Sequence, residues 1–511
     1  MIIRRILILG CLLASSLGIA QAKSFSDGFV YLDQNKNGQL DSGEPGVKGV
    51  SVSNGLEVIQ TDADGYWKLP VRNEEAIFVV KPAGYQVGVK SNQLPKHYFL
   101  FDDVEQAAKN KSKLNFPLQR NDEPQQFDVL FWGDPQARGM KEVEYIAHDV
   151  VEECLATEAR FGVSLGDLVA DDPLLMDSIS QYIGHIGIPW YNIFGNHDND
   201  RQAKSNQERD DTFERFFGPS TYAFEYGQVV FIALNNIFYG DDGRYSPHFT
   251  SEQIAFAKSY LRAVPADKLV VLMMHAPIIE CDNKEAMLEL IQDRKHTFSI
   301  SGHAHEQAHL FLDAGQGWQG AEAHHHLVNA TVCGSWWCGL KDELGIPHAT
   351  MNDGAPNGYS IVSFDENSYK IRFKAARRPA DYQMNIYLPE QIDAAKTGEQ
   401  VVVVNVFAGS EKSVVEMQVN GQGSWFNLEK KDQIDPQSLQ VHLLNPYLEL
   451  EKGDHKLEDV LGYPMDYPSV STHMWEGKLP DNLTSGVYKL TVRTKDMFGQ
   501  EWRAHRLFRV N

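Results

Sequence analysis

Five hydrophobic runs in the middle of the chain each end in a short cluster of polar residues, and this pattern restricts the fold more than any other feature. The run at 188–194 is followed by Gly195 and then by Asn196, His197 and Asp198. A short apolar run that ends at a glycine predicts a buried strand followed by a turn. Open α/β sheets bind their ligands at the carboxyl ends of such strands. One cluster alone is more typical of a solvated turn, so its meaning depends on the other four.

The other four clusters follow predicted strands at 127–132, 161–165, 269–274 and 297–300. In chain order they contain Asp134 and Gln136, Asp167 and Asp171, His275, and finally His303 and His305. Helices predicted at 140–160, 178–186 and 251–261, the last with Thr250 as its N-cap, separate several of these strands. Alternating strands and helices indicate an α/β fold with a parallel sheet. Because buried polar groups are costly without partners, the pattern predicts that a metal cluster joins these side chains.

The chain has 511 residues, which is enough for about three domains. Residues 23–120 contain short strands between Asn, Asp and Gly turns and predict an all-β domain. The central domain is predicted at 121–377. Alternating runs at 378–511 are typical of an immunoglobulin-like β domain.

A possible calcium loop lies in the first domain. Oxygen-bearing side chains stand at positions one, three, five, nine and twelve of this loop, with Gly38 at position six: Asp33, Asn35, Asn37, Asp41 and Glu44. This spacing matches the calcium-loop pattern, although its flanks are predicted strands and not helices. An ordinary polar hairpin turn is the alternative. Residues 27–85 resemble the B-type repeats of bacterial surface adhesins and prealbumin-like sandwiches, which implies a structural or spacing role.

Residues 1–22 have the pattern of an export signal. Arg4 and Arg5 precede an apolar core at 6–13, and small residues at 20–22 form a cleavage site. The apolar core is too short to span a bilayer, so we expect a periplasmic or secreted protein without a stable membrane span. A lipoprotein signal at Cys11 is a minor alternative, since that cysteine falls early in the apolar core.

Export would place four cysteines in an oxidising compartment: Cys154, Cys281, Cys333 and Cys338. Four cysteines allow three pairings, and the sequence does not choose among them.

The formal charge of −22 disfavours nucleic acid and anionic lipid as partners. The oligomeric state stays open.

The ordered clusters resemble the motifs of the calcineurin-like metallophosphoesterase family over residues 127–306. The motifs are Gly-Asp134-x-Gln136, Gly-Asp167-x-x-x-Asp171, Gly-Asn196-His197-Asp198, His275 and Gly-His303-x-His305. The resemblance implies a four-layer α/β/β/α sandwich with a two-metal site at one edge. The flanking N-terminal and C-terminal β-sandwich domains resemble those of an exported bacterial subset.

The resemblance also implies roles for these residues. Asp134, Gln136, Asp167 and His305 would hold the first metal, and Asp167 would bridge to a second metal held by Asn196, His275 and His303. Two such ions polarise a phosphoryl group and lower the pKa of a shared water, which makes a bridging hydroxide the nucleophile. His197 would protonate the leaving oxygen, and Asp198 would orient His197.

Gln136 departs from the commonest family pattern, which has histidine at this position. An amide oxygen favours manganese, magnesium or iron(II) over zinc, so we expect manganese. Glutamine at this position also occurs in related manganese-dependent ADP-ribose and CDP-alcohol diphosphatases, which leaves a nucleotide diphosphate substrate open.

Two further groups lie beyond the motifs. We interpret the His324–His326 triplet as an incidental surface loop, and we predict that Trp336, Trp337 and Asn357 line the substrate pocket. The sequence therefore predicts an exported enzyme that hydrolyses a phosphate monoester or diester of a phosphorylated small molecule or an envelope-derived phosphoester. The alternatives are hydrolysis of a pyrophosphate bond, and a non-catalytic envelope protein that binds through its β domains.

Overall fold

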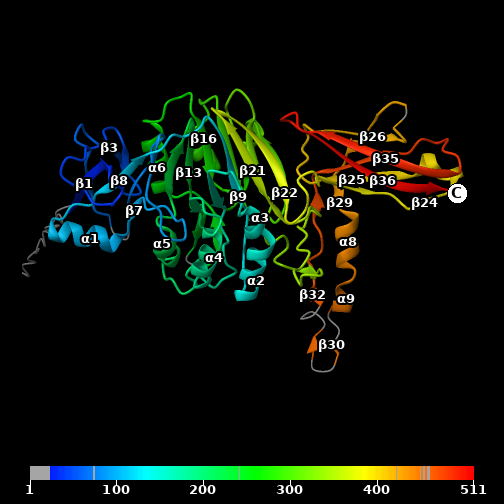
Figure 1. Cartoon of the computed structure of the whole chain (residues 1–511), viewed down its shortest axis with the longest axis horizontal. Coiled ribbons are helices and arrows are strands. Elements are labelled where there is room, and N and C mark those ends of the chain that lie inside the picture. The colour runs from blue at the N-terminus through cyan, green and yellow to red at the C-terminus, as the bar shows by residue number, and fades with distance from the viewer. Residues whose placement is uncertain are drawn as a thin grey trace, which may run out of the picture.

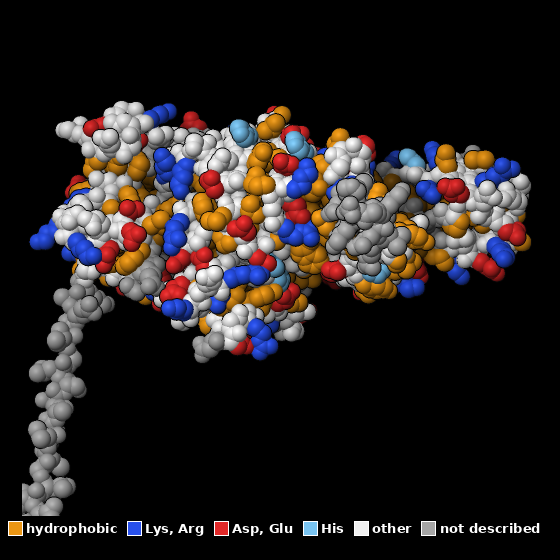
Figure 2. All heavy atoms as spheres, turned by 90° about the horizontal axis from the view of Figure 1, so that it is seen from below, with side chains coloured by type: hydrophobic (Ala, Val, Ile, Leu, Met, Phe, Trp, Pro, Cys, Tyr) orange, Lys and Arg blue, Asp and Glu red, His pale blue; other side chains and the backbone are white. Residues whose placement is uncertain are grey.

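The computed structural model describes residues 24–72, 75–240, 242–421, 423–448, 451–452, 455–456 and 461–511. The predicted export signal at 1–22 lies outside these residues. Three β-rich regions follow one another along the long axis of the molecule (Figure 1). On the face shown in Figure 2, acidic and basic side chains are interspersed with apolar ones.

The N-terminal region consists of two four-stranded sheets with a shared apolar core. One sheet contains β4 (Tyr66–Pro70), β1 (Phe25–Leu32), β8 (Phe116–Arg120) and β6 (Tyr85–Gln86). The other contains β3 (Val58–Gln60), β2 (Ser51–Ser53), β5 (Ile77–Val79) and β7 (Tyr98–Phe99). Helix α1 (Phe101–Asn110) buries Val104 and Ala107 in the same core. The expected all-β architecture is therefore present, with one added helix.

The central region contains two larger sheets. The first has the order β11 (Trp190–Asn192), β10 (Phe161–Ser164), β9 (Gln126–Trp132), β21 (Gly358–Asp365) and β22 (Ser368–Ala375). The second has the order β12 (Tyr222–Tyr226), β13 (Val229–Ala233), β16 (Leu269–Met273), β17 (Thr297–Ser301), β19 (His324–Val328) and β18 (Ala308–Leu312). Strands β9, β10 and β11 are parallel, as are β13, β16, β17 and β19. Parallel strands need cover on both faces, which explains why every residue of β13 and β16 is buried.

Helices supply the two outer layers. On the first sheet, apolar residues of α2 (Met140–Ile146), α4 (Leu175–Gly184) and α5 (Asp211–Phe217) pack around Leu130 and Trp132 of β9. On the second sheet, α6 (Ser251–Leu261) and α7 (Lys284–Leu288) join the core that contains β13 and β16. The resulting α/β/β/α sandwich confirms the predicted fold class. Thr250 is the N-cap of α6, as predicted, and accepts a hydrogen bond from Gln253 N. The Gln253 side chain completes a capping box by accepting from Thr250 N.

The helix predicted at 140–160 is shorter than expected. After α2 the chain makes a π-helical turn at Ala147–Val151, continues as α3 (Glu152–Cys154) and then leaves the helix. The helix predicted at 178–186 is α4, which begins and ends earlier than predicted.

The C-terminal region is a second β-sandwich. One sheet has the order β23 (Met384–Tyr387), β25 (Val401–Val406), β34 (Met474–Lys478) and β28 (Glu429–Lys430). The other has the order β24 (Gln391–Ile392), β36 (Glu501–Val510), β35 (Gly486–Lys495), β26 (Val414–Val419) and β27 (Phe426–Asn427). Helices α8 (Pro436–His442) and α9 (Asn445–Leu448) extend beside it (Figure 1). The strand pairs outside the large sheets are β14 (Ile237–Tyr239) with β15 (Tyr245–Pro247), β20 (Gly339–Leu340) with β32 (Gly462–Tyr463), β29 (Gln433–Ile434) with β33 (Val470–Ser471), and β30 (Glu451–Lys452) with β31 (His455–Lys456).

The central region contacts each of the other two through apolar and polar groups. Phe78 of β5 packs against Phe256 of α6, and Phe407 packs against Phe373 of β22. Val58 N donates to Ser259 Oγ at 3.2 Å between the first two regions. Buried His473 lies 2.9 Å from the carboxylate of Asp353, which joins the C-terminal sandwich to the central region. The domain limits at 120 and 377 stay a prediction.

The interpretation of His324–His326 as a surface loop is wrong, because these residues form the start of β19 and are buried. Their neighbours on β17 explain this burial. Ser299 Oγ lies 2.8 Å from His324 Nε2 and 2.7 Å from His326 Nδ1, so a hydroxyl from the next strand satisfies both rings. His325 points the other way and stacks on Tyr369 of β22.

Cys154, Cys281, Cys333 and Cys338 are free thiols in this structure, so none of the three possible pairings is formed. Within the part of the chain that the structure describes, no helix is long and apolar enough to cross a membrane.

Candidate metal centre

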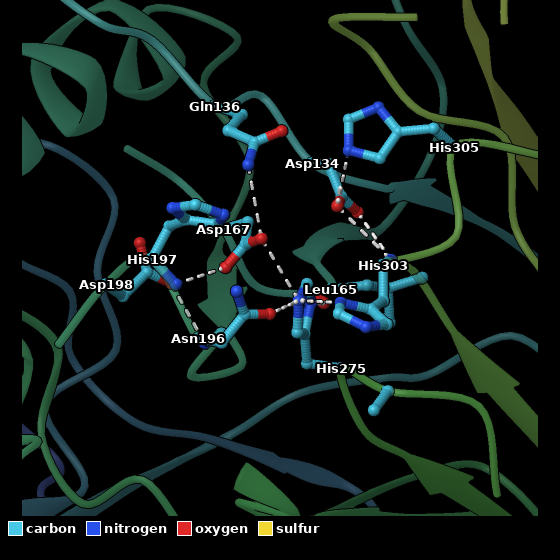
Figure 3. A network of polar contacts seen from close by, with 12 residues as sticks. Asp134, Gln136, Leu165, Asp167, Asn196, His197, Asp198, His275, His303 and His305 are labelled. Atoms are coloured by element: carbon cyan, nitrogen blue, oxygen red, sulfur yellow. Dashed lines mark hydrogen bonds and ion pairs between the residues drawn. The ribbon is translucent and has the colours of Figure 1, made fainter. Parts of the chain in front are cut away.

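The five polar clusters meet at one place in the central sandwich (Figure 3). They follow β9, β10 and β11 of the first sheet and β16 and β17 of the second. Parallel strands bring their carboxyl ends to the same edge, and the two packed sheets bring the two edges together. The predicted residues are therefore assembled although they are spread over about 170 positions of the chain.

Glycines before the polar residues permit this close approach. A Cβ at Gly195 would lie 2.1 Å from Asp167 N, and one at Gly302 would lie 2.3 Å from Asp134 Oδ1. Several site residues also have left-handed backbone conformations, with φ between 38° and 81°: Asp134, Gln136, Asp167, Asp171, His303 and His305. Such conformations cost about 1–3 kcal/mol each in non-glycine residues and concentrate at functional sites. The turns therefore hold these side chains in positions that relaxed loops would not favour.

One end of the cluster contains Asp167, Asn196, His275 and His303. His275 Nε2 lies 3.2 Å from Asp167 Oδ2, 3.1 Å from Asn196 Oδ1 and 3.1 Å from His303 Nδ1. The possible ligand atoms of Asp167, His275 and His303 all lie within 4.8 Å of one another. These are the residues predicted to hold the second metal.

The other end contains Asp134, Gln136 and His305. His305 Nε2 lies 3.5 Å from Asp134 Oδ2. Gln136 Nε2 donates to Asp167 Oδ2 at 3.4 Å, so Asp167 contacts residues of both ends. This is the position that the predicted bridging carboxylate requires.

Burial shapes the charges of the cluster. It raises the pKa of Asp134, and the charge of His275 only partly opposes this rise. Burial alone would also raise the pKa of Asp167, but the charge and hydrogen bond of His275 outweigh it and hold that pKa below its ordinary value. Burial lowers the pKa of His303 to about 3 and that of His305 to about 4, so both rings are neutral and can act as ligands.

The donor set fits a divalent cation. His275 Nδ1 is 2.8 Å from Leu165 O and donates to it, so Nε2 is the nitrogen that faces the oxygens of Asp167 and Asn196. Burial alone would lower the pKa of His275, but the charge and hydrogen bond of Asp167 outweigh it and raise that pKa to about 10, so Nε2 holds a proton that pairs with Asp167. A divalent cation would take the place of this proton. His305 is oriented in the same way, because its Nδ1 lies 2.5 Å from Gly334 O and its Nε2 faces Asp134.

His197 lies beside the cluster and is about one-third exposed. Its Nδ1 is 2.8 Å from Asp171 Oδ1, and Arg201 pairs with the same oxygen. The prediction that Asp198 orients His197 is therefore wrong. Asp198 points back into its own turn and accepts hydrogen bonds from Gly195 N at 3.0 Å and Val169 N at 3.2 Å. Asp171 belongs to the second motif, but the sequence does not show that it reaches His197, whereas Asp198 is the adjacent carboxylate in the chain.

The predicted pocket residues separate in the structure. Trp336 is partly exposed and stacks on His305, with ring centroids 4.1 Å apart. Trp337 is fully buried and donates through Nε1 to Pro135 O at 3.0 Å. Asn357 is buried and donates through Nδ2 to Asp149 Oδ2 at 2.6 Å. The fully buried Trp337 has no surface to offer a ligand, which contradicts its pocket-lining role. The roles of Trp336 and of Asn357, which lines a pocket together with Asp342 and Arg377, stay predictions.

Sequence reasoning missed the β14–β15 hairpin, which borders the site. Tyr239 of this hairpin donates through its hydroxyl to Asn196 O at 2.6 Å. The hydroxyl of Tyr245 lies 3.5 Å from His303 Nε2, and Tyr245 is 39% exposed. A short strand pair far from any motif gives no sequence signal for such contacts.

The calcium-type loop joins β1 to β2. Asp41 Oδ2 accepts hydrogen bonds from Asn35 Nδ2 at 2.8 Å and Asn37 Nδ2 at 2.7 Å. Asp33 accepts from Asn37 N, and Glu44 from Gln34 N and Asp41 N. The five predicted side chains thus share one loop, and calcium binding there stays a prediction.

Three family models match the chain in order. The model described as N terminal of Calcineurin-like phosphoesterase matches residues 34–121, Calcineurin-like phosphoesterase matches 127–307, and C terminal of Calcineurin-like phosphoesterase matches 326–502. The chain belongs to the calcineurin-like phosphoesterase family. Membership implies a site for two divalent metal ions, in agreement with the donor set at the sheet edge.

Other similarities are more limited. The chain is 37% identical over 75 residues to Colossin-A of Dictyostelium discoideum, a match that covers 14% of this chain and only 1% of that protein. A dimetal phosphatase from Danio rerio is 13% identical, with a TM-score of 0.30 over 48% of this chain and 98% of the other. Purple acid phosphatase PPD1 from yellow lupin (Lupinus luteus) is also 13% identical, with a TM-score of 0.37 over 69% of this chain and 66% of the other.

Proposed function

We propose that this calcineurin-like protein is an exported, metal-dependent phosphoesterase that hydrolyses a phosphate monoester or diester of a small molecule or of the cell envelope. The observation that supports this most strongly is the convergence of possible ligand atoms from Asp167, Asn196 and His275 at about hydrogen-bond distance. A scaffold for a binding protein would not need these buried polar groups on strained turns.

Two bound divalent ions would polarise the phosphoryl group and supply an activated water. Asp134, Gln136, Asp167 and His305 would hold one ion, and Asp167, Asn196, His275 and His303 the other. His197 is not needed as a ligand. Its Nδ1 is engaged by Asp171, so Nε2 is left to hold the proton that the leaving oxygen requires.

Gln136 sets the preference among metals. Its Oε1 faces Cys333 Sγ at 3.7 Å, while its Nε2 faces Asp167. A half-turn of the amide brings the oxygen to the Asp167 side, and the two atoms of such an amide are interchangeable in shape. An amide oxygen is a hard ligand, so manganese, magnesium or iron(II) should support activity better than zinc, with manganese preferred.

The direct test is hydrolysis of 4-nitrophenyl phosphate and bis(4-nitrophenyl) phosphate by the purified protein with each divalent metal in turn. We expect a chelator to abolish hydrolysis and manganese to restore it. Hydrolysis that survives exhaustive removal of metal would contradict the proposal. Export is tested separately, by following the full chain in cell fractions with and without residues 1–22.

A further inference from the structure

Two aromatic side chains stand at opposite ends of the metal centre. Trp336 lies on His305 at the end that also contains Gln136, and Tyr245 lies beside His303 at the end that also contains His275. Figure 3 shows His305 with Gln136 on one side and His303 with His275 on the other. Both aromatic side chains keep exposed surface, so each can contact a bound molecule.

The backbone around Trp336 is fixed in a strained conformation. Trp336 and Trp337 are both left-handed, with φ of 53° and 54°. Arg138 Nη2 donates to Trp336 O at 2.8 Å, and the buried indole of Trp337 anchors the next residue to Pro135 O. Two left-handed tryptophans in succession are costly, and these two contacts hold them in place. The result is that one indole enters the core while the other covers His305.

The C-terminal region also contacts the loop that carries Trp336. Tyr463 of β32 pairs with Gly339 of β20, three residues after Trp336. The Arg138 guanidinium lies 5.2 Å from the ring centre of Tyr463. The loop that carries Trp336 is therefore enclosed between Arg138 and a strand from the C-terminal domain, which suits a rigid surface for recognition.

At the opposite end, Tyr245 lies on the β14–β15 hairpin opposite Tyr239. The Tyr245 ring meets His303 edge-on, with centroids 6.0 Å apart. The hydroxyl of Tyr239 fixes the hairpin to Asn196 O, so the position of Tyr245 is tied to a predicted metal ligand. An ester group that extends from the phosphorus toward this end would meet an aromatic side chain as well.

The charges around the site favour a diester over a diphosphate. Arg138 pairs with Glu142 at 2.7 Å, and Arg201 pairs with Asp171. These two arginines are already neutralised by carboxylates, so they are poor partners for the extra charge of a second phosphate. A diester carries a single negative charge, which the metal centre itself can neutralise.

We infer that the site is selective for phosphodiesters whose ester groups are flat and unsaturated, with Trp336 and Tyr245 as specificity-determining residues. The inference rests on the proposed phosphoesterase function. Hydrolysis of such a diester consumes one water: a new P–O bond forms to the water oxygen, the P–O bond to one ester group breaks, and a monoester and an alcohol or phenol are released.

Two diesters with the same leaving group provide the test. Bis(4-nitrophenyl) phosphate and methyl 4-nitrophenyl phosphate both release nitrophenolate and differ only in the group that stays on phosphorus. We expect the wild-type protein to have the higher kcat/KM on the bis-aryl ester. Of Trp336→Leu and Tyr245→Leu, the variant that loses the side chain stacked on the retained ring should lower the ratio of the two kcat/KM values by about tenfold. The other variant loses a contact to the shared leaving group and should lower both kcat/KM values together.

The ratio of the two kcat/KM values distinguishes a role of Trp336 and Tyr245 in substrate recognition from a purely structural role. Loss of metal caused by a shifted His305 would lower both rates together and leave the ratio unchanged, and metal content is measured on each variant. Tyr182→Leu, which changes an exposed tyrosine of α4, is the matched control and should keep the wild-type ratio.

A wild-type ratio in both site variants, with both esters still hydrolysed, would overturn the inference and leave the proposed function intact. Higher kcat/KM on 4-nitrophenyl phosphate than on either diester would also overturn it. Failure to hydrolyse any ester with any metal would instead remove the proposed function on which the inference depends.

Discussion

Replacing Asp171 by asparagine should slow hydrolysis without releasing metal. Asp171 Oδ1 lies 2.8 Å from His197 Nδ1, and asparagine keeps an acceptor of the same shape but loses the charge. A hydrogen bond to a charged group contributes about 1.5–3 kcal/mol. The side chains are 33% and 30% exposed, so solvent screening places this pair at the lower limit. A loss of about 1.5 kcal/mol corresponds to a fall of about tenfold in kcat.

Three variants make this prediction specific. His197→Ala should lose the ~10²–10⁴ typical of a missing general acid, and the loss should be smaller for a good leaving group such as nitrophenolate than for phenolate. Asp171→Asn should show the same dependence on the leaving group with a smaller amplitude. Asp172→Asn is the control, since the Asp172 carboxylate accepts from Leu174 N and not from a histidine.

The assay is kcat on 4-nitrophenyl and phenyl esters, together with metal content after gel filtration. If Asp171→Asn lost metal, or if its rate loss did not depend on the leaving group, the positioning role of Asp171 would be refuted. If Asp198→Asn reproduced the His197→Ala profile and Asp171→Asn did not, Asp198 would regain the role that the sequence suggested.

Three further outcomes are expected. Asp167→Ala should lower metal occupancy and rate together, because it removes the carboxylate that contacts both ends of the cluster; full occupancy by mass spectrometry under native conditions would contradict this. Calcium should raise the Tm of the wild-type protein, and Asp33→Ala should abolish that response; an unchanged response would make the loop a plain turn. Burial lowers the pKa of His324 and of His326 to about 3, so the unfolded chain takes up protons below about pH 6.5 while the folded protein does not. The free energy of unfolding should therefore fall by about 1.4 kcal/mol per pH unit for each of these histidines between about pH 6.5 and 3, and a flat denaturant midpoint between pH 7 and 4.5 would exclude this effect.

The fold and the convergence of the proposed metal ligands could be predicted because they depend on local patterns that repeat. Each strand is an apolar run closed by glycine, and parallel strands must bring their ends to one edge. The N-cap at Thr250 is a local pattern too, and the structure contains it. The order of the motifs along the chain was enough to predict that side chains from two sheets converge at one site.

The errors arose where contacts depend on tertiary geometry. Asp198 is adjacent to His197 in sequence, but its turn directs it at Gly195 N, and Asp171 from another loop reaches the imidazole. The side chains of Trp336 and Trp337 point in different directions because both residues have a left-handed backbone conformation, and no sequence pattern predicts that conformation.

The prediction for the His324–His326 triplet was wrong for a related reason. His324 and His326 are buried only because the register of β17 against β19 places Ser299 opposite His326 and between the two rings. Registers of this kind follow from the packed sheet and not from the polar residues themselves.

The measurement that tests the central claim most directly is a manganese titration of metal-depleted protein, with bound metal and hydrolysis of bis(4-nitrophenyl) phosphate followed in the same samples. Two sites that share Asp167 predict that activity appears only as the second ion binds, and that Asp167→Ala shows neither the second binding event nor the activity. Full hydrolysis with one ion per chain, or with none, would contradict a dinuclear centre.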